Sequence, residues 1–169
     1  MRLSEGVEWG LHCLAILGGL PEGGTLPGRV LAEFHGVSPT YLLKHLKTLT
    51  EAGLVESVPG PRGGFRLAKP PETITLLDTV IAIDGEAAAF RCTEIRQRSP
   101  VRRSATAFAL PCPVKVAMLK ADAAWRAALA SQTLADIIGA VTRIADQEGL
   151  RRNAEWLAER VRFTTNTLS

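Results

Sequence analysis

Glu8 and His12 lie four residues apart in the apolar stretch VEWGLHCLAIL, which covers residues 7–17. Side chains four residues apart share one face of an α-helix, so this carboxylate and this imidazole can reach the same metal centre. Because the stretch is apolar almost all round the helical wheel, we expect both groups to be buried. The structural alternative is that His12 is a hydrogen-bonded core residue and that Glu8 complements the positive end of the helix.

Three cysteines are the other residues able to bind a metal: Cys13, Cys92 and Cys112. They are too few and too scattered for the disulfide framework of a secreted protein. In a reducing compartment they serve as packing residues, reactive thiols or metal ligands. Cys112 precedes Pro113 at a predicted helix start, where unpaired backbone N–H groups favour the thiolate. Cys13 points about 100 degrees away from His12 around the helix and is the poorer ligand candidate.

The composition is that of a soluble globular protein, with 46% hydrophobic and 22% charged residues. No apolar run reaches the roughly 18 to 20 residues of a membrane span, and the first residues lack the apolar core of a signal peptide. We therefore expect a cytoplasmic protein. Residues 38–70 carry five Lys and Arg against two Asp and Glu, and residues 91–103 carry five against one. Positive charge concentrated in this way favours a polyanionic partner.

The first half of the chain has the pattern of a helix-turn-helix. Ser4 is a good N-cap for a helix that runs to residues 18–19, and a second helix fits residues 26–35. A third helix fits residues 38–53, with leucines on one face. Two helices joined by about three residues that include a Gly form a helix-turn-helix, whose second helix enters the DNA major groove. The buried stripe of the third helix consists of Leu42, Leu46 and Leu49.

A β-hairpin is predicted directly after the third helix. The strand-like runs LVESV and FRLA, at residues 54–58 and 65–68, flank the turn PGPRGG. A helix-turn-helix followed by a hairpin is a winged helix, with Arg62 at the wing tip and two glycines that let the backbone approach a phosphate closely. The candidate DNA contacts are Ser38, Pro39, Thr40, Tyr41, Lys44, Lys47, Arg62, Gly63 and Gly64. Alternatively, the two lysines are ordinary surface residues and the tyrosine is half-buried packing.

The second half predicts helices on either side of a loop. Residues 74–85 are amphipathic and are expected to pack onto the winged helix. Residues 90–110 show little periodicity and are interpreted as a loop with a cysteine near each end. A long helix then starts at Cys112, and its heptad-like face consists of Val116, Leu119 and Ala123. Helix continues from residue 133 with a break near Gly149, and this tail packs on the long helix or wraps a partner.

Residues 38–85 resemble the Rrf2 family of bacterial transcription regulators. The segments AGLV, GPRGGF and ITLLDTVIAIDG carry the resemblance, which extends more weakly to about residue 138. It implies a homodimer that binds double-stranded operator DNA through each wing and recognition helix. We therefore predict a mainly α fold with a small β-hairpin wing, in which a winged helix-turn-helix is followed by a long dimerisation helix.

The same resemblance implies a domain organisation of three segments. Residues 1–85 would form the DNA-binding domain with its linking helix, residues 86–111 a cluster-binding loop, and residues 112–169 the dimerisation helix and a helical tail. Members of the family carry an iron-sulfur cluster in this loop, usually held by three closely spaced cysteines. This chain departs from that pattern because only Cys92 and Cys112 are present there.

The arrangement resembles the RsrR type of Rrf2 regulator, whose [2Fe-2S] cluster has mixed Cys, Glu and His ligation. The resemblance implies that the ligands are Glu8, His12, Cys92 and Cys112. Because the first helix packs near the dimer helices in this family, its pair of ligands would complete a site begun by the partner's loop. Trp9, beside a proposed ligand, is a candidate relay to the DNA-reading unit, unless it is only a core residue.

Other functions were weighed against this one. A cluster-free regulator would use Cys92 and Cys112 as a thiol switch or sense through a protein partner. A small electron carrier or metalloenzyme is disfavoured because the chain lacks HExxH, Walker and Rossmann patterns and a nucleophile with its base. We therefore expect neither an enzyme nor a small-molecule substrate, and no membrane partner. A protein-interaction module that merely retains the winged helix would lack salt-dependent DNA affinity.

Overall fold

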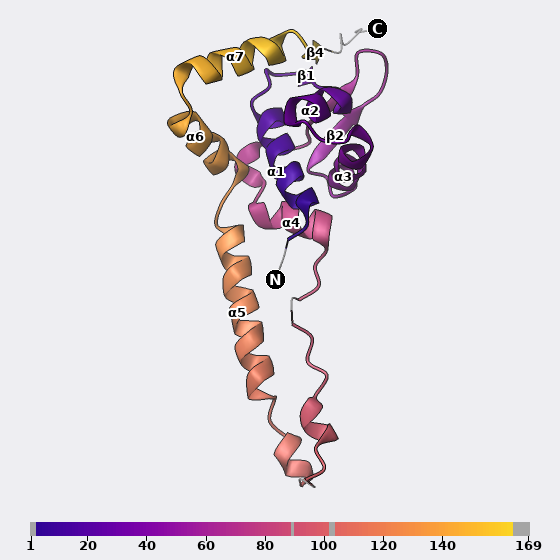
Figure 1. Cartoon of the computed structure of the whole chain (residues 1–169), viewed down its shortest axis with the longest axis vertical. Coiled ribbons are helices and arrows are strands. Elements are labelled where there is room, and N and C mark those ends of the chain that lie inside the picture. The colour runs from indigo at the N-terminus through magenta and orange to yellow at the C-terminus, as the bar shows by residue number, and fades with distance from the viewer. Residues whose placement is uncertain (1–2, 89, 102–103, 164–169) are drawn as a thin grey trace.

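A body of packed helices carries one long arm (Figure 1). The computed structural model describes residues 3–88, 90–101 and 104–163. The arm consists of the segment that follows α4 together with helix α5. In chain order the main elements are α1 (Glu5–Gly18), β1 (Gly24–Thr25), α2 (Gly28–His35), α3 (Pro39–Glu51), β2 (Val55–Val58), β3 (Gly64–Leu67), α4 (Leu76–Asp84), α5 (Pro113–Ala130), α6 (Leu134–Ile144), α7 (Gln147–Ala158) and β4 (Arg162–Phe163).

Helices α2 and α3 form the predicted helix-turn-helix. Helix α3 begins at Pro39 after the N-cap residue Ser38, as the sequence indicated. Its inner face carries the three predicted leucines, which are fully buried, and this face packs against α1, α2 and α4. The fold prediction is confirmed: the chain is mainly helical, with a small antiparallel hairpin and a long helix outside the winged-helix body. The buried stripe is Leu42, Leu46 and Leu49.

Helix α2 begins at Gly28, two residues later than predicted. Leu26 is extended instead, because its N–H donates to the Phe65 carbonyl (3.0 Å) and its own carbonyl accepts from the Phe65 N–H (2.7 Å). Pro27 consequently takes the N-cap position. Backbone pairing with the hairpin has therefore overruled the local preference for helix.

The wing is the antiparallel hairpin of β2 and β3, with Val58 opposite Gly64. Its two glycines are needed by the protein's own backbone. A Cβ on Gly64 would lie 2.5 Å from the Leu26 carbonyl, and a Cβ on Gly63 would collide with the Val58 carbonyl oxygen. Contact of these glycines with a DNA phosphate stays a prediction.

Helix α4 ties the start of the arm to the body. Its capping box joins Thr75 and Asp78, since the Thr75 hydroxyl accepts from the Asp78 N–H (3.1 Å) and the Asp78 carboxylate accepts from the Thr75 N–H (2.8 Å). The helix packs against α1 and α3, as expected for residues 74–85. Ile74 lies just before the helix and is nevertheless buried.

The arm contains little that this chain alone can bury. Between residues 86 and 111 its described residues form only two short 3-10 turns, Ile95–Arg98 and Ala105–Phe108. Helix α5 then runs back to the body, and in the described chain none of its residues is buried. Its exposed apolar side chains are Val114, Val116, Met118 and Leu119. No helix among the described residues is long and apolar enough to cross a bilayer.

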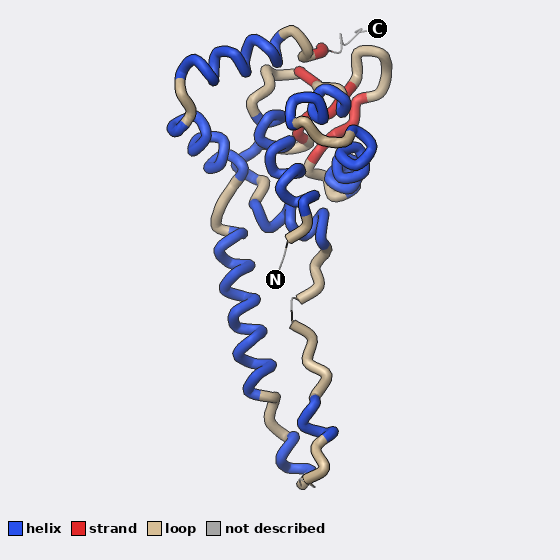
Figure 2. The backbone as a smooth tube through the Cα atoms, viewed as in Figure 1, coloured by secondary structure: helices blue, strands red, loops and turns tan. Residues whose placement is uncertain are grey.

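The C-terminal helices fold back onto the body, which corrects the expectation that they pack on α5 or on a partner. Helix α6 packs against α1, and β4 pairs with β1 (Figure 2). Trp156 of α7 stacks on Phe34 of α2, with ring centroids 5.3 Å apart. The break between α6 and α7 precedes the predicted position at Gly149, because the Asp146 carboxylate accepts from the Gly149 N–H (2.7 Å) and caps α7.

We predict opposite effects for two glycine substitutions. Gly64→Ala should lower the free energy of unfolding by about 1 to 3 kcal/mol, because the new methyl group must displace backbone. Gly139→Ala, in α6, meets only the flexible end of Arg143 at 3.4 Å and should raise it by up to about 1 kcal/mol through helix propensity. Urea unfolding of both variants measures the difference. A Gly64→Ala variant as stable as wild type would contradict the packing of the wing on Leu26.

Candidate cofactor site and nucleic-acid interface

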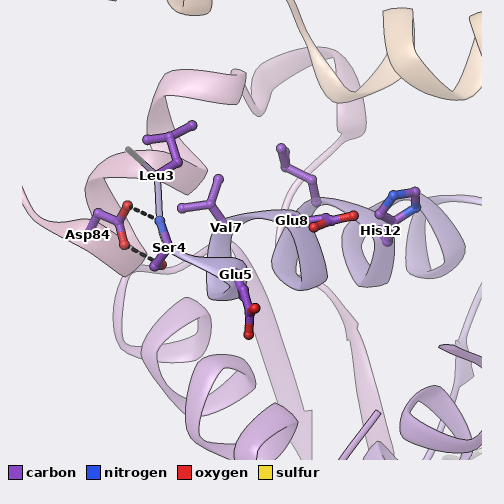
Figure 3. A pocket seen from close by; sticks show the side chains of 8 residues that line it. Leu3, Ser4, Glu5, Val7, Glu8, His12 and Asp84 are labelled. Atoms are coloured by element: carbon purple, nitrogen blue, oxygen red, sulfur yellow. Dashed lines mark hydrogen bonds between the residues drawn. The ribbon is translucent and has the colours of Figure 1, made fainter. Parts of the chain in front are cut away.

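Glu8 and His12 lie on one face of α1, as predicted, but both are exposed in this chain. The prediction that they are buried is therefore wrong for a single chain. Helix α1 directs Val7, Cys13 and other apolar residues into the body, and the described chain does not cover the opposite side. Figure 3 shows the Glu8 carboxylate extending toward the His12 ring.

The Glu8 and His12 pair borders an open hollow of about 980 Å³. The Ser4 N–H donates to the Asp84 carboxylate (3.0 Å), so the start of α1 is fixed to the end of α4 at one edge of the hollow (Figure 3). The lining of the hollow thus combines apolar side chains with carboxylate and imidazole groups. Its lining residues are Leu3, Ser4, Glu5, Val7, Glu8, Leu11, His12 and Asp84.

Cys92 and Cys112 share a cationic neighbour on the arm. The Arg96 guanidinium interacts electrostatically with both thiols, forms a salt bridge with Glu94 and lies 5.5 Å from the centroid of the Phe108 ring. It also donates to a backbone carbonyl just before α5 at 3.4 Å. Arg96, in the part of the arm that leads away from α4, is thus hydrogen-bonded to Leu110, just before α5 begins.

Cys112 and Cys13 differ in acidity. Backbone N–H groups of Lys115 and Val114 hold the pKa of Cys112 below its usual value, and the Arg96 charge adds to the effect. The expectation of a favoured thiolate at the start of α5 is thus confirmed. Burial raises the pKa of Cys13 to about 12, so this thiol stays protonated in the core.

One chain does not bring the two predicted ligand pairs together. Helix α5 starts, just after Cys112, on the part of the arm away from the body, whereas α1 lies in the body (Figure 1). Among the described residues, no group of three or more His, Cys, Asp or Glu side chains could hold a metal ion. A four-ligand set that combines both pairs stays a prediction.

Sequence reasoning missed His35, whose ring centroid lies 5.7 Å from that of His12. Its Nε2 is buried without a hydrogen-bond partner in the described structure. Desolvation lowers the pKa of His35, and the nearby His12 lowers it further. No short-range sequence motif indicates His35, because it lies on α2 and meets His12 of α1 only in the folded chain. A second hollow of about 240 Å³ is lined by Glu8, Trp9, His12, His35 and Val37.

Trp9 connects this face to the recognition helix α3. Its ring lies edge-on to Tyr41, with centroids 6.3 Å apart, and edge-on to His45, with centroids 6.1 Å apart. The half-buried Trp9 therefore sits between the candidate ligands and two side chains of the helix that would read DNA.

The predicted DNA contacts are grouped on α3 and the wing. Tyr41 is 62% exposed, so the interpretation of it as packing inside this chain fails. Lys47 forms a salt bridge with Glu51 at 3.7 Å, and both side chains remain largely exposed. The exposed candidates are Ser38, Pro39, Thr40, Tyr41, Lys44, Lys47 and Arg62. The first helical turn of α3 and the wing tip thus present polar and cationic groups to solvent.

These features define a winged-helix protein of the transcription-regulator class. Residues 3–140 match the model of the Rrf2 family, described as an iron-dependent transcriptional regulator. The chain belongs to the Rrf2 family, which confirms the resemblance found in its sequence. Assignment to the RsrR type remains a prediction.

Individual relatives agree with this membership. The chain is 28% identical over 162 residues to YwgB of Bacillus subtilis, named as an HTH-type transcriptional regulator, and the match covers 96% of this chain and 98% of YwgB. Among solved structures, CymR, the global cysteine regulator of B. subtilis, has a TM-score of 0.66 at 24% identity over 82% of this chain and 97% of CymR. IscR of T. potens has a TM-score of 0.62 at 24% identity over 89% of this chain and 96% of IscR. These structures establish the shared fold.

We predict that the thiols separate by reactivity in the metal-free protein. Cys112 should be alkylated by iodoacetamide at a lower pH than an ordinary thiol, because its lowered pKa increases the thiolate fraction. Cys13 should stay unmodified until the protein is unfolded. Mass spectrometry of the alkylated peptides across a pH series measures both rates. Equal rates at Cys13 and Cys112 would contradict the assigned environments.

Proposed function

We propose that the protein is a homodimeric, DNA-binding transcription regulator whose operator affinity follows the redox state of a [2Fe-2S] cluster. Glu8 and His12 of one subunit and Cys92 and Cys112 of the other would hold the cluster. The observation that carries this proposal is the separation of the two candidate ligand pairs, one on α1 in the body and one on the arm, where helix α5 buries none of its residues in its own chain.

The apolar face of α5 supports dimerisation. Val116 is 53% exposed and Leu119, three residues further on the same face, is 40% exposed in the single chain, on a helix of 18 residues. A second copy of the same helix would cover this face, since twofold contacts between identical surfaces are the commonest way to build a homodimer. At about 1.5 Å per residue, α5 provides a seam of about 27 Å.

An antiparallel pair of α5 helices would bring the ligands together. The body end of α5 lies beside α4, where Arg126 donates to the Glu86 carbonyl (2.8 Å). The start of α1 is fixed to the same region through Asp84. The partner's α5, running in the opposite direction, would place its Cys112 end there, near Glu8 and His12 of the first subunit.

The chemistry of the donors fits such a cluster. Two thiolates, a carboxylate and an imidazole make up the four protein ligands that a [2Fe-2S] cluster normally takes. The backbone N–H groups at the start of α5 already favour the Cys112 thiolate, and Arg96 supplies positive charge to both cysteines. When bound, the cluster would supply a centre that accepts or donates one electron.

Residues 1–85 would read the DNA. The start of α3 would enter the major groove, with Lys44 and Lys47 attracting phosphates and Tyr41 near the bases, while Arg62 reaches the backbone or minor groove. Two copies related by a twofold axis would bind the two halves of a pseudo-palindromic operator. Such an interface predicts affinity that falls steeply with salt.

Trp9 would couple the two activities. Its edge-on contacts with Tyr41 and His45 connect the ligand face of α1 to the recognition helix. A change of charge beside Glu8 and His12 would alter the position of α1, and the packed ring would transmit that change to α3.

A second candidate is a regulator that binds DNA without a cluster and uses Cys92 and Cys112 as a thiol switch. The observation in its favour is that both thiols interact with Arg96 and therefore lie in one neighbourhood. The chain also resembles the oxidized form of CymR from Staphylococcus aureus, with a TM-score of 0.61 at 25% identity. Iron analysis separates the two candidates.

A mixed dimer tests whether the ligands come from two subunits. One subunit carries Glu8→Ala and His12→Ala, and the other carries Cys92→Ala and Cys112→Ala. A shared site predicts that the mixed dimer retains one intact cluster, whereas each variant homodimer has none. Iron and sulfide counts after anaerobic purification through two different tags measure this, with Cys13→Ala as the matched control. A mixed dimer without iron would place the ligands within one chain, and iron-free wild type would leave the thiol switch.

Substitution of Trp9 tests the relay. Wild-type protein should bind DNA with affinities that differ at least about fivefold between the oxidised and reduced states. Trp9→Ala should keep its iron but lose this difference, whereas Trp9→Phe should keep much of it. Fluorescence anisotropy with a duplex that wild-type protein has selected from a random pool provides the measurement. Undiminished redox sensitivity in Trp9→Ala would exclude the relay, and failure of wild type to select any sequence would exclude operator binding.

A further inference from the structure

The end of the described chain returns to the wing. Strand β4 pairs antiparallel with β1, and Thr25 stands opposite Arg162. Leu26, the next residue after β1, is hydrogen-bonded to Phe65 of β3. The C-terminal strand is thus joined through β1 to the hairpin that forms the wing (Figures 1 and 2).

Two polar contacts hold the wing turn from this side. The Arg162 guanidinium donates to the Pro61 carbonyl at 2.8 Å, which is a charge-assisted hydrogen bond to the residue before Arg62. The Thr25 hydroxyl lies 3.4 Å from the Arg62 carbonyl and 3.3 Å from the Arg162 carbonyl, so it can donate to either. Thr25 is fully buried although its side chain is polar.

Strand β4 is itself firmly anchored. Helix α7 leads into it, and Trp156 of that helix stacks on Phe34 of α2. The Arg160 guanidinium covers the same indole ring at 3.9 Å from its centroid, and Val161 packs against the core. Arg162 therefore contacts Pro61 from a strand that is packed firmly on the body.

The wing turn itself is exposed from Pro59 to Arg62. Within the turn, the Gly63 N–H donates to the Gly60 carbonyl at 2.9 Å. A turn with an exposed tip must be ordered when it binds a ligand, and this ordering reduces affinity unless the free protein has already fixed its conformation. The Arg162 and Thr25 contacts supply such fixation by holding the two peptide units on either side of Arg62.

We propose that Arg162 is a positioning residue for DNA binding. By holding the Pro61 carbonyl, it sets the backbone of the wing tip so that Arg62 is presented in one orientation. This inference rests on the proposed DNA-binding function and is independent of the cluster. It also gives helices α6 and α7 a role, because they place strand β4 where Arg162 can hold the wing turn.

A double-mutant cycle tests the inference on the full-length dimer. Arg162→Met keeps the length of the side chain without its donors and should weaken binding to the selected duplex about threefold to tenfold. Arg62→Ala should weaken binding as well, and the combined variant should be no weaker than Arg62→Ala alone, because Arg162 acts through Arg62. Arg152→Met, at a largely exposed position of α7, is the control for lost positive charge and should bind like wild type.

Two further measurements distinguish a local change at the wing from general unfolding of the C-terminal segment. Hydrogen exchange at the Gly63 amide should accelerate in Arg162→Met, while amides of α3 keep their protection. Thr25→Val removes the second contact without changing residue volume and should reproduce the loss of affinity. Unchanged affinity in both Arg162→Met and Thr25→Val would overturn the proposal.

Two other results would also overturn it. Losses of Arg62→Ala and Arg162→Met that add fully would mean that Arg162 contacts DNA directly. An equal loss in Arg152→Met would mean that only the charge of the tail matters. Failure of the wild-type protein to select DNA would instead reject the proposed function, so the two failures are distinguishable.

Discussion

The packing of α1 is the constraint on which the rest of the structure depends. One side of this helix supplies Cys13, Leu14 and Leu17 to the core, and α3, α4 and α6 pack against it. The other side leaves Glu8 and His12 in solvent. Because α1 is fixed to so many elements, a force applied to its exposed face cannot be absorbed locally, and interiors this dense transmit strain. The proposed ligand face of α1 and the recognition helix α3 are therefore connected through one rigid helix.

The distribution of ligand candidates over the chain has a physical logic. A carboxylate and an imidazole are solvated on the body of the single chain, which thereby avoids the cost of burying unpaired polar groups. The thiol with a raised pKa, Cys13, is confined to the core, whereas Cys112 occupies a helix start that favours its thiolate. Reactive sulfur is thus kept apart from the helix that holds the fold together.

Local patterns in the sequence predicted much of this fold. The N-cap at Ser38, the buried leucines of α3 and the hairpin after it follow from short-range rules that the structure obeys. The errors arise where distant segments meet. Leu26 pairs with Phe65 instead of starting α2, and the tail packs on the body through Trp156. The site shows the same division: the spacing of Glu8 and His12 was visible, but their exposure and the neighbour His35 depend on tertiary packing.

The exposed apolar side chains of α5 affect the fate of a newly made copy of the protein. A newly synthesised copy would present four large hydrophobic side chains of one helix to water until it meets another copy: Val114, Val116, Met118 and Leu119. Surfaces of this kind attract chaperones and proteases, and pairing stabilises the folded chain by mass action. Copies made too sparsely to pair would be cleared before they could occupy a promoter. The protein would consequently accumulate only above a threshold rate of synthesis.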